Sequence, residues 1–208
     1  MRKLTRPPFD LNDHHLDFGC GVVPRNPFRA KKLTCVDVNA DANNQKMLVI
    51  TPGSRLPFPN ETFSSVSAYD VLEHLPRVSQ TGNAFIFYMN ELCRVLKPGG
   101  MAVFVFPSFP HRDAFSDPTH VNFITKDTVD FFLATPNGPF YENIQTTYML
   151  LRNQKLRVFA YWVYDAEIHP KEKASISFRR RLSLGKRTVM RFLFPGHRIW
   201  ILQKRITH

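Results

Sequence analysis

Short segments of strand length, each with apolar residues among polar ones, recur along the first half of the chain. Residues 15–18, 32–37, 46–51 and 64–69 are of this kind, and each predicts a strand. Residues 101–106 form a continuous apolar run, as expected of a central parallel strand that is buried on both faces.

A helix is predicted between the last two of these strands. Within residues 83–96 the apolar side chains recur at helical spacing and would form one face: Phe85, Met89, Leu92 and Leu96. The sequence Pro98-Gly99-Gly100 ends this helix. Strands that alternate with helices in this way predict an α/β fold, with a sheet covered by helices on both faces.

The second half of the chain begins with a long loop, residues 107–123, and a short helix predicted over residues 126–134. Its remaining apolar segments predict strands at residues 144–151, 156–164 and 198–203. Between the last two strands, residues 171–196 form a basic segment with a helical apolar stripe, which Pro195-Gly196 ends.

The charge of the chain is concentrated in its last part. Residues 171–208 hold 11 of the 28 lysines and arginines but only one of the 17 acidic residues, whereas the preceding part is nearly balanced. Such asymmetry predicts an anionic partner for residues 171–205, either nucleic acid, an anionic membrane surface or a phosphorylated carrier. A basic face that only stays in water, or that covers the sheet with its apolar stripe, is the simpler alternative.

The composition indicates a cytoplasmic protein. No apolar run is long enough to span a membrane, and the first residues lack the apolar core of a secretion signal. Three cysteines without paired spacing, Cys20, Cys35 and Cys93, predict reduced thiols rather than a disulfide framework or a zinc site.

Candidate ligand contacts follow the first two predicted strands. Gly19 and Gly21 come directly after one strand, where a backbone without Cβ atoms can approach a ligand. Asp37 ends the next strand, where an acid can accept the hydroxyl groups of a ribose. A dinucleotide-binding motif would need a third glycine at position 24, which is proline here, so the nicotinamide alternative is disfavoured.

Four segments together resemble the class I S-adenosylmethionine-dependent methyltransferases, in their broad type 11 group. These are LDFGCG (16–21), VDVN (36–39), LPFPNETFSSVSAYDVLEHLPR (56–77) and NELCRVLKPGG (90–100). The resemblance implies a Rossmann-like, doubly wound, mostly parallel seven-stranded sheet, in one methyltransferase domain over residues 1–208. The loop 107–125 also resembles a narrower subgroup that is associated with bacterial surface-polysaccharide biosynthesis.

The resemblance implies roles for particular residues. The methionine end of the cofactor would be lined by Asp17, Gly19, Cys20 and Gly21, and its sulfonium and amino group would face Tyr69 and Asp70. The ribose would be held by Asp37, with Val38 packing on the adenine.

The adenine edge would meet Ser54, Arg55 and Leu56. The family often has an acid four residues before the Leu-Pro-Phe segment, where this chain has Pro52, so backbone would have to make that contact. The stretch before the first strand is short, so we expect the family's usual covering helices to be missing or minimal there and residues 107–122 to cover the acceptor instead.

An oxygen acceptor needs a base, and a neutral histidine suits that role near pH 7. We expect His120 to be this base, with Asp117 orienting its ring from three residues earlier. His74 is expected to cap a helix or to support the site. A metal held by His111, Asp113, Asp117 and His120 is conceivable, but the resemblance requires none and we expect none.

The predicted function is methyl transfer from S-adenosyl-L-methionine to an oxygen of a small molecule or glycan precursor. Two alternatives remain: an RNA methyltransferase, suggested by the basic segment, and a non-catalytic protein that binds S-adenosylmethionine. The first lacks a recognisable RNA-binding module, and the second would explain the departure at Pro52.

Overall fold

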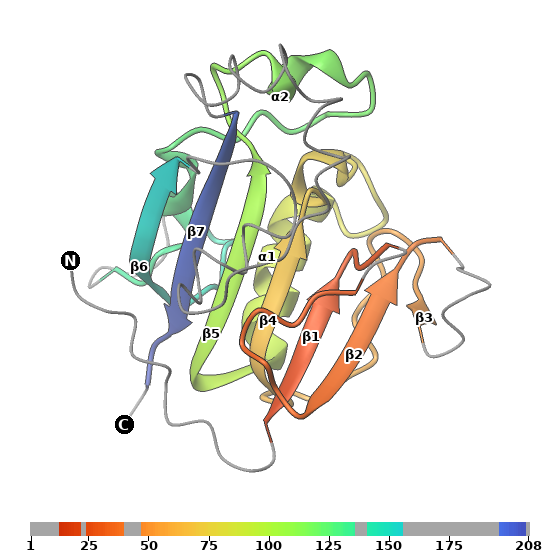
Figure 1. Ribbon diagram of the computed structural model, residues 1–208, viewed down its shortest axis with the longest axis vertical. Coiled ribbons are helices and arrows are strands. Elements are labelled where there is room, and N and C mark those ends of the chain that lie inside the picture. Colours follow the sequence, from red (N-terminus) through yellow and green to blue (C-terminus); the bar gives the residue numbers. More distant parts are fainter. Residues whose placement is uncertain (1–12, 22–23, 40–46, 136–140, 156–195, 207–208) are drawn as a thin grey trace, which may run out of the picture.

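The computed structural model describes residues 13–21, 24–39, 47–135, 141–155 and 196–206. One seven-stranded sheet dominates them, with the strand order β3-β2-β1-β4-β5-β7-β6 (Figure 1). Its strands are β1 (His14–Phe18), β2 (Lys32–Asp37), β3 (Leu48–Val49), β4 (Phe63–Tyr69), β5 (Leu96–Pro107), β6 (Tyr148–Lys155) and β7 (His197–Lys204). The α/β fold and the number of strands that the family resemblance implies are confirmed.

The sheet is mixed, and β7 is the strand that makes it so. The pairs from β3 to β5 are all parallel, whereas β7 runs antiparallel to both β5 and β6. Of the described strands β7 comes last in the sequence, yet it lies between β5 and β6, which both precede it. Its amino end therefore lies beside the carboxyl end of β5, where His197 is opposite Pro107.

The order of the strands reverses between β1 and β4. From β1 the chain moves outward through β2 and β3, and then returns to the other side of β1 with β4 and β5. Such a reversal leaves a crevice at the carboxyl ends of the neighbouring strands, which is where open α/β sheets bind ligands.

One face of the sheet is covered by α1 (Ala84–Val95). Asn83 caps this helix, because its Oδ1 accepts hydrogen bonds from the backbone N–H groups of Phe85 and Ile86 at 3.0 and 3.3 Å. The predicted apolar stripe is buried against the sheet, in a core that includes Phe85, Met89 and Leu92.

Helices on both faces were predicted, and the described residues show this for one face only. On the other face, the described part of the connection between β1 and β2 (residues 24–31) is irregular. Pro24 and Pro27 account for this, since proline interrupts helical hydrogen bonding. Phe28 fills the space there, packing in a second core cluster with Tyr69 and residues of β5 and β7.

The remaining elements are short. They are η1 (Leu72–His74), α2 (Asp113–Ser116) and η2 (Thr128–Phe132), of which η2 stands in place of the helix predicted over residues 126–134. The strand predicted at 156–164 lies outside the described residues, as does all but the last residue of the basic segment at 171–196. Within the described ranges, no helix has both the length and the apolar character needed to cross a membrane.

Candidate active site

The glycine turn after β1 is held close to the sheet. Gly19 donates its N–H to the carbonyl of Val36 at 2.8 Å and has a φ of +72°. A Cβ on Gly19 would lie 2.5 Å from Cγ2 of Val71, so no larger residue fits. Gly21 also has a positive φ, +52°, but nothing described lies within 4 Å of where its Cβ would be. The turn is thus packed on one side and open on the other, as a ligand cradle requires.

Asp37 faces this open side. Its Oδ2 accepts a hydrogen bond from the Gly21 N–H at 2.9 Å, and its Oδ1 accepts one from the Asn39 N–H at 3.0 Å. Each carboxylate oxygen keeps a lone pair that a ribose hydroxyl can use. The neighbouring Val38 is 46% exposed, which leaves an apolar surface for an adenine ring. Both residues therefore fit the nucleoside part of S-adenosylmethionine.

Asp17 has a structural task beside the turn. It is buried, its Oδ2 accepts a hydrogen bond from the Arg25 N–H at 2.6 Å, and its Oδ1 accepts one from the Ser67 hydroxyl at 2.7 Å. These bonds tie the backbone that follows the glycine turn to β1 and β4. Any contact with the methionine end of a cofactor would be additional to them.

Ser67 continues this network to a buried histidine. Because the Ser67 hydroxyl hydrogen goes to Asp17, its oxygen accepts from His15 Nε2, 2.9 Å away. His15 Nδ1 is then left to accept from Ser65, 2.8 Å away. Burial, together with the charge of His14, lowers the pKa of His15 to about 3, so the ring is neutral at physiological pH.

Cys20 lies in the same turn and is buried. Burial raises the pKa of its thiol well above the usual range, with Cys35 and two aspartates adding to the shift. All three cysteines are free and buried. A protonated thiol lining the turn can contact the cofactor but cannot act as a nucleophile.

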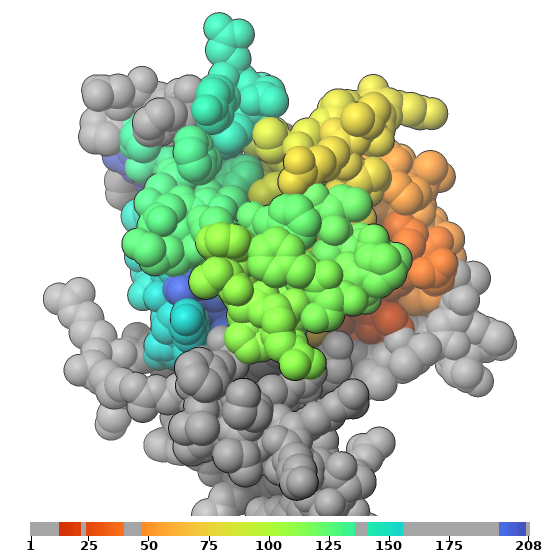
Figure 2. Space-filling model, turned by 90° about the horizontal axis from the view of Figure 1, so that it is seen from above, coloured from red at the N-terminus to blue at the C-terminus, as the bar shows by residue number. Residues whose placement is uncertain are grey.

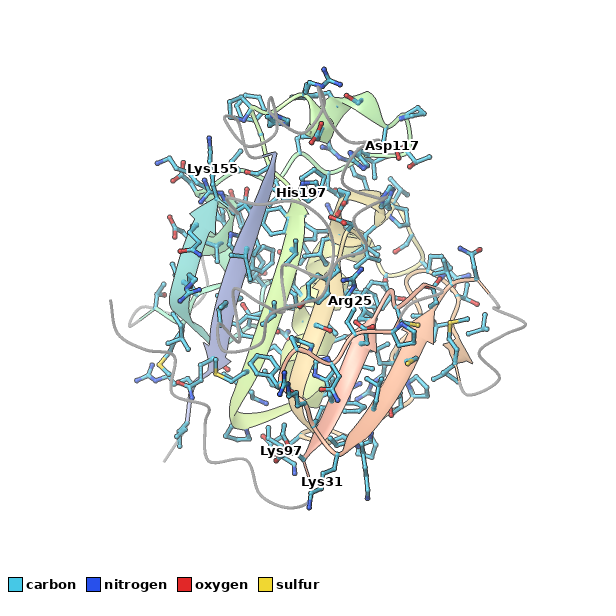
Figure 3. The ribbon with its side chains drawn as sticks, viewed as in Figure 1. Arg25, Lys31, Lys97, Asp117, Lys155 and His197 are labelled. Carbon is cyan, nitrogen blue, oxygen red and sulfur yellow. The ribbon has the colours of Figure 1, made fainter. Side chains whose placement is uncertain are left out.

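Tyr69 and Asp70 end β4 at the centre of the crevice. The guanidinium of Arg25 lies over the Tyr69 ring, 4.7 Å from its centroid. Asp70 has a φ of +51°, and its Oδ1 lies 3.1 Å from Nε2 of His197. In Figure 3, Arg25 lies in front of the sheet and His197 at the upper end of β7. Sequence reasoning missed both residues, because nothing in their local sequence marks them as neighbours of β4.

The predicted adenine edge is only partly at a surface. Leu56 is fully buried, and its N–H donates to Oε2 of Glu91 at 2.9 Å, so its side chain belongs to the core. Ser54 and Arg55 are more accessible and follow the turn at Pro52, where the Ser54 N–H bonds to the Thr51 carbonyl at 2.9 Å. On this side of the site, an adenine ring could therefore be contacted by the backbone of the turn.

A cleft of about 490 Å³ opens beside Asp70, over the carboxyl ends of β4 and β5. In Figure 2, which looks down on this edge, the residues that follow β5 cover its centre. The lining is rich in carboxylates and imidazoles: Asp70, Glu73, His74, Asp113, Asp117, His120 and His197. The cleft therefore combines an opening to the predicted cofactor site with groups that can hold or accept a proton.

The two predicted catalytic residues both line this cleft. His120 Nδ1 lies 3.2 Å from the carbonyl of Ala114, which can only accept, so this nitrogen carries the proton. Its Nε2 lies 4.0 Å from Oδ2 of Asp117. The structure thus brings Asp117 and His120 together, but the group that orients the His120 ring is the Ala114 carbonyl.

Asp117 instead supports His74 through Thr119. The Thr119 hydroxyl donates to Oδ1 of Asp117 at 2.6 Å, so it accepts from His74 Nδ1, 2.9 Å away. The rings of His74 and His120 meet edge to face, 4.7 Å apart. Burial and the nearby His120 lower the pKa of His74, so the His74 ring can present an unprotonated Nε2.

Glu73 lies beneath these rings and was not a candidate in the sequence. It is 1% exposed, and neither carboxyl oxygen has a hydrogen-bond partner among the described residues. Burial, with the charges of Asp70 and Asp117, raises its pKa to about 9. Its only sequence signal is its place in Val71-Leu72-Glu73-His74, just beyond the end of β4.

The set His111, Asp113, Asp117 and His120, considered for a metal from the sequence, does not come together as a ligand cluster in the described residues. His111 instead pairs with Asp113 at 3.4 Å, and the two pack against Gly196. The ligand atoms that do converge belong to Glu73, His74 and His120, which lie within 4.8 Å of one another.

Comparisons with known proteins agree with this geometry. Residues 16–104, which hold most of β1 and β5, all of β2 to β4 and the glycine turn, match the family described as "Methyltransferase domain". No curated protein matches the sequence. Residues 16–104 are therefore a methyltransferase domain, and the protein is an S-adenosylmethionine-dependent methyltransferase whose cofactor is S-adenosyl-L-methionine.

Solved structures share the fold at low sequence identity. A provisionally assigned methyltransferase from Bacillus halodurans is 17% identical over 96% of this chain and 95% of its own, with a TM-score of 0.55. An S-adenosylmethionine-dependent methyltransferase from Archaeoglobus fulgidus is 14% identical over 92% and 86%, with a TM-score of 0.54. The [4+2]-cyclase SpnF is 16% identical over 94% and 76%, also with a TM-score of 0.54. A cyclase among these neighbours shows that the shared fold does not define the acceptor.

Proposed function

We propose that the protein transfers a methyl group to a hydroxyl oxygen of a small molecule or glycan precursor bound in the cleft. The observation that carries this proposal is the pair of imidazoles, His74 and His120, whose unprotonated Nε2 atoms line the cleft beside Asp70. Such nitrogens can accept the proton that an oxygen nucleophile must lose.

S-adenosylmethionine supplies a methyl carbon that is already activated by a sulfonium. In the transfer, the acceptor oxygen bonds to that carbon as the carbon–sulfur bond breaks, and the electron pair of the broken bond stays on sulfur. The hydroxyl proton goes to His120 Nε2, and the resulting imidazolium is stabilised by the carboxylate of Asp117, 4.0 Å away. The charge of Asp117 thus stabilises protonated His120, and its hydrogen bond to Thr119 holds the His74 ring in position.

The other residues hold the reactants. Gly19 lets the turn pack closely on Val71, Gly21 leaves room for the methionine end, and Asp37 accepts the ribose hydroxyls. Asp70 offers its carboxylate to the cofactor's ammonium group. The loop from Pro107 to Asn122 covers the acceptor and excludes water, because its backbone is tied to η1 by bonds from Val121 and Asn122 to the Glu73 carbonyl.

The excess of positive charge in residues 171–205 favours binding of the enzyme to an anionic partner. We propose that they bring it to a phosphorylated carrier or to an anionic membrane surface in the cytoplasm, and that nucleic acid is their alternative partner. Salt-sensitive binding to vesicles that contain anionic lipid, set against binding to RNA, distinguishes these partners.

Acceptor screening tests the proposal. Extract separated into lipid, glycan, small-molecule and RNA fractions is incubated with the enzyme and methyl-labelled S-adenosylmethionine. Label in an ether of a glycan or small molecule supports the proposal, and His120→Ala should reduce it by at least about 100-fold while cofactor binding persists. The matched control is His111→Asn, a histidine of the same loop that does not line the cleft, which should keep activity. Label in the RNA fraction alone would overturn the proposal.

A further inference from the structure

Three potential metal ligands converge at the floor of the cleft, from two segments far apart in the sequence. Glu73 and His74 end η1 below β4, and His120 comes from the loop after β5. One ligand atom of each lies within 4.8 Å of the other two. This is slightly more than twice a metal–ligand distance of about 2.1 Å, so small side-chain rotations bring all three into range.

The hydrogen bonds around the two histidines leave the same nitrogen of each ring available. His120 gives its Nδ1 proton to the Ala114 carbonyl, and His74 gives its own to Thr119, which is fixed by Asp117. Ligating histidines typically have their other ring nitrogen tied to a carbonyl or carboxylate in this way, which fixes tautomer and orientation. Both Nε2 atoms are therefore prepared to donate lone pairs.

Glu73 supplies the independent sign of a missing ligand. Its side chain is almost completely buried, it lines the cleft, and no described residue gives either of its oxygens a hydrogen bond. Buried polar atoms nearly always have a partner, so a buried carboxyl with two unsatisfied oxygens calls for one. A cation would displace the proton of this carboxyl and satisfy its oxygens.

We propose that Glu73, His74 and His120 bind a divalent transition-metal cation such as Zn²⁺, with an open coordination position that faces the cleft. Two imidazoles and one carboxylate form a donor set that suits such cations, and three protein ligands leave room for an exchangeable one. With the cation bound, the lone pair of His120 Nε2 is taken up by the metal, so His120 is then a ligand and not the base. An acceptor hydroxyl that coordinates the cation is deprotonated more readily, and releases its proton to solvent.

This inference rests on the proposed function only in using the cleft as the acceptor site, and it departs from the expectation of a metal-free protein. Binding is therefore tested without turnover. Untagged protein is stripped with chelator and titrated calorimetrically with Zn²⁺ and with Mn²⁺, and Co²⁺ is added to observe visible ligand-field absorption. The expected result is one equivalent of cation per chain, with absorption bands of a nitrogen- and oxygen-ligated Co²⁺.

Variants locate the site. Glu73→Gln and His120→Ala should each weaken Zn²⁺ binding by at least about 100-fold, and Thr119→Val, which frees the His74 ring, should weaken it by about 10- to 100-fold. His111→Asn should bind as the unaltered protein does. Zn²⁺ should also raise the Tm of the unaltered protein but not that of Glu73→Gln. The same melting curves show whether the variant is folded.

Each outcome bears on one proposal. Absence of binding, or binding that persists in Glu73→Gln and His120→Ala, overturns the metal site. If the protein binds no cation at these residues but still methylates an oxygen acceptor in a His120-dependent manner, the proposed function survives with His120 as the base. If the cation binds at these residues but only RNA is methylated, the metal site stands and the proposed acceptor class fails.

Discussion

Asp70 and His197 meet at 3.1 Å, although one ends β4 and the other begins β7. Asp70 is the residue that the family resemblance assigns to the cofactor's amino group, and His197 holds its carboxylate at the edge of the cleft. One contact thus connects the cofactor side of the crevice with the acceptor side. Substitutions can distinguish the roles of the two residues.

Asp70→Asn should weaken the binding of S-adenosylmethionine and of its demethylated product by about tenfold or more. The change removes the charge that attracts the ammonium group, about 1.4 kcal/mol for a factor of ten. Asparagine tolerates the left-handed backbone at this position, so the fold should be kept. Calorimetry measures both affinities. His197→Gln, which keeps a donor near Asp70, is the matched control, and equal losses in both variants would contradict a direct role of Asp70.

Gly19→Ala should lower the free energy of unfolding by at least about 2 kcal/mol. A left-handed alanine costs about 1–2 kcal/mol, and the new Cβ also collides with Val71. Gly82→Ala is the control, because Gly82 has a similar φ of +82° but no described atom within 4 Å of its Cβ position. It should lose about 1 kcal/mol in urea denaturation. Equal losses for the two variants would mean that the contact with Val71 is unimportant.

The buried His15 should make stability depend on pH. Its pKa is about 3 in the folded protein, whereas a histidine in the unfolded chain has the ordinary value of 6.5. The unfolded state therefore binds one more proton between these values. The contribution of neutral His15 to the free energy of unfolding is complete above pH 6.5. It falls by about 1.4 kcal/mol per pH unit as the pH drops toward 3.

Urea denaturation at about pH 7, 6, 5 and 4 measures this slope. In His15→Gln the same measurement should give a flatter dependence, since glutamine can still bond to Ser65 and Ser67 but does not titrate. An unchanged slope would assign the acid sensitivity to other groups.

Asn122 should be important for keeping the cleft closed at its base. Its Nδ2 donates to the carbonyls of Leu72 and Leu75 at 3.0 and 2.7 Å, in a buried position. Asn122→Ala leaves both carbonyls without this donor and should cost about 2 kcal/mol. Asn122→Asp should cost more, because a carboxylate repels the two carbonyl oxygens. Chemical denaturation ranks the variants, and an aspartate variant as stable as the alanine one would contradict this reasoning.

Much of the sheet could be predicted from the sequence, because apolar residues recur in short segments of strand length. Residues 32–37 coincide with β2, and the apolar run at 101–106 lies within β5. The direction of β7 could not be predicted. Its alternating segment at 198–203 indicates a strand, but which neighbours it joins depends on contacts with β5 and β6 that are distant in sequence.

The candidate site shows the same division. Gly19, Gly21 and Asp37 follow strands directly, and the rule that ligands bind at carboxyl ends was enough to group them. The convergence of Glu73 with His120 was hidden, because it depends on how the loop after β5 folds back onto η1. Asp117 and His120, three residues apart, suggested a pair of side chains, whereas the hydrogen bonds of the Asp117 side chain go to Thr119.

The late position of β7 also sets the order in which the two halves of the crevice can be built. During synthesis, the strands that carry the glycine turn and Asp37 emerge from the ribosome well before residues 197–204. The nucleoside half can form its parallel pairs while β5 still has an open edge. His197, and with it the complete wall of the acceptor cleft, arrives only when β7 fills that edge.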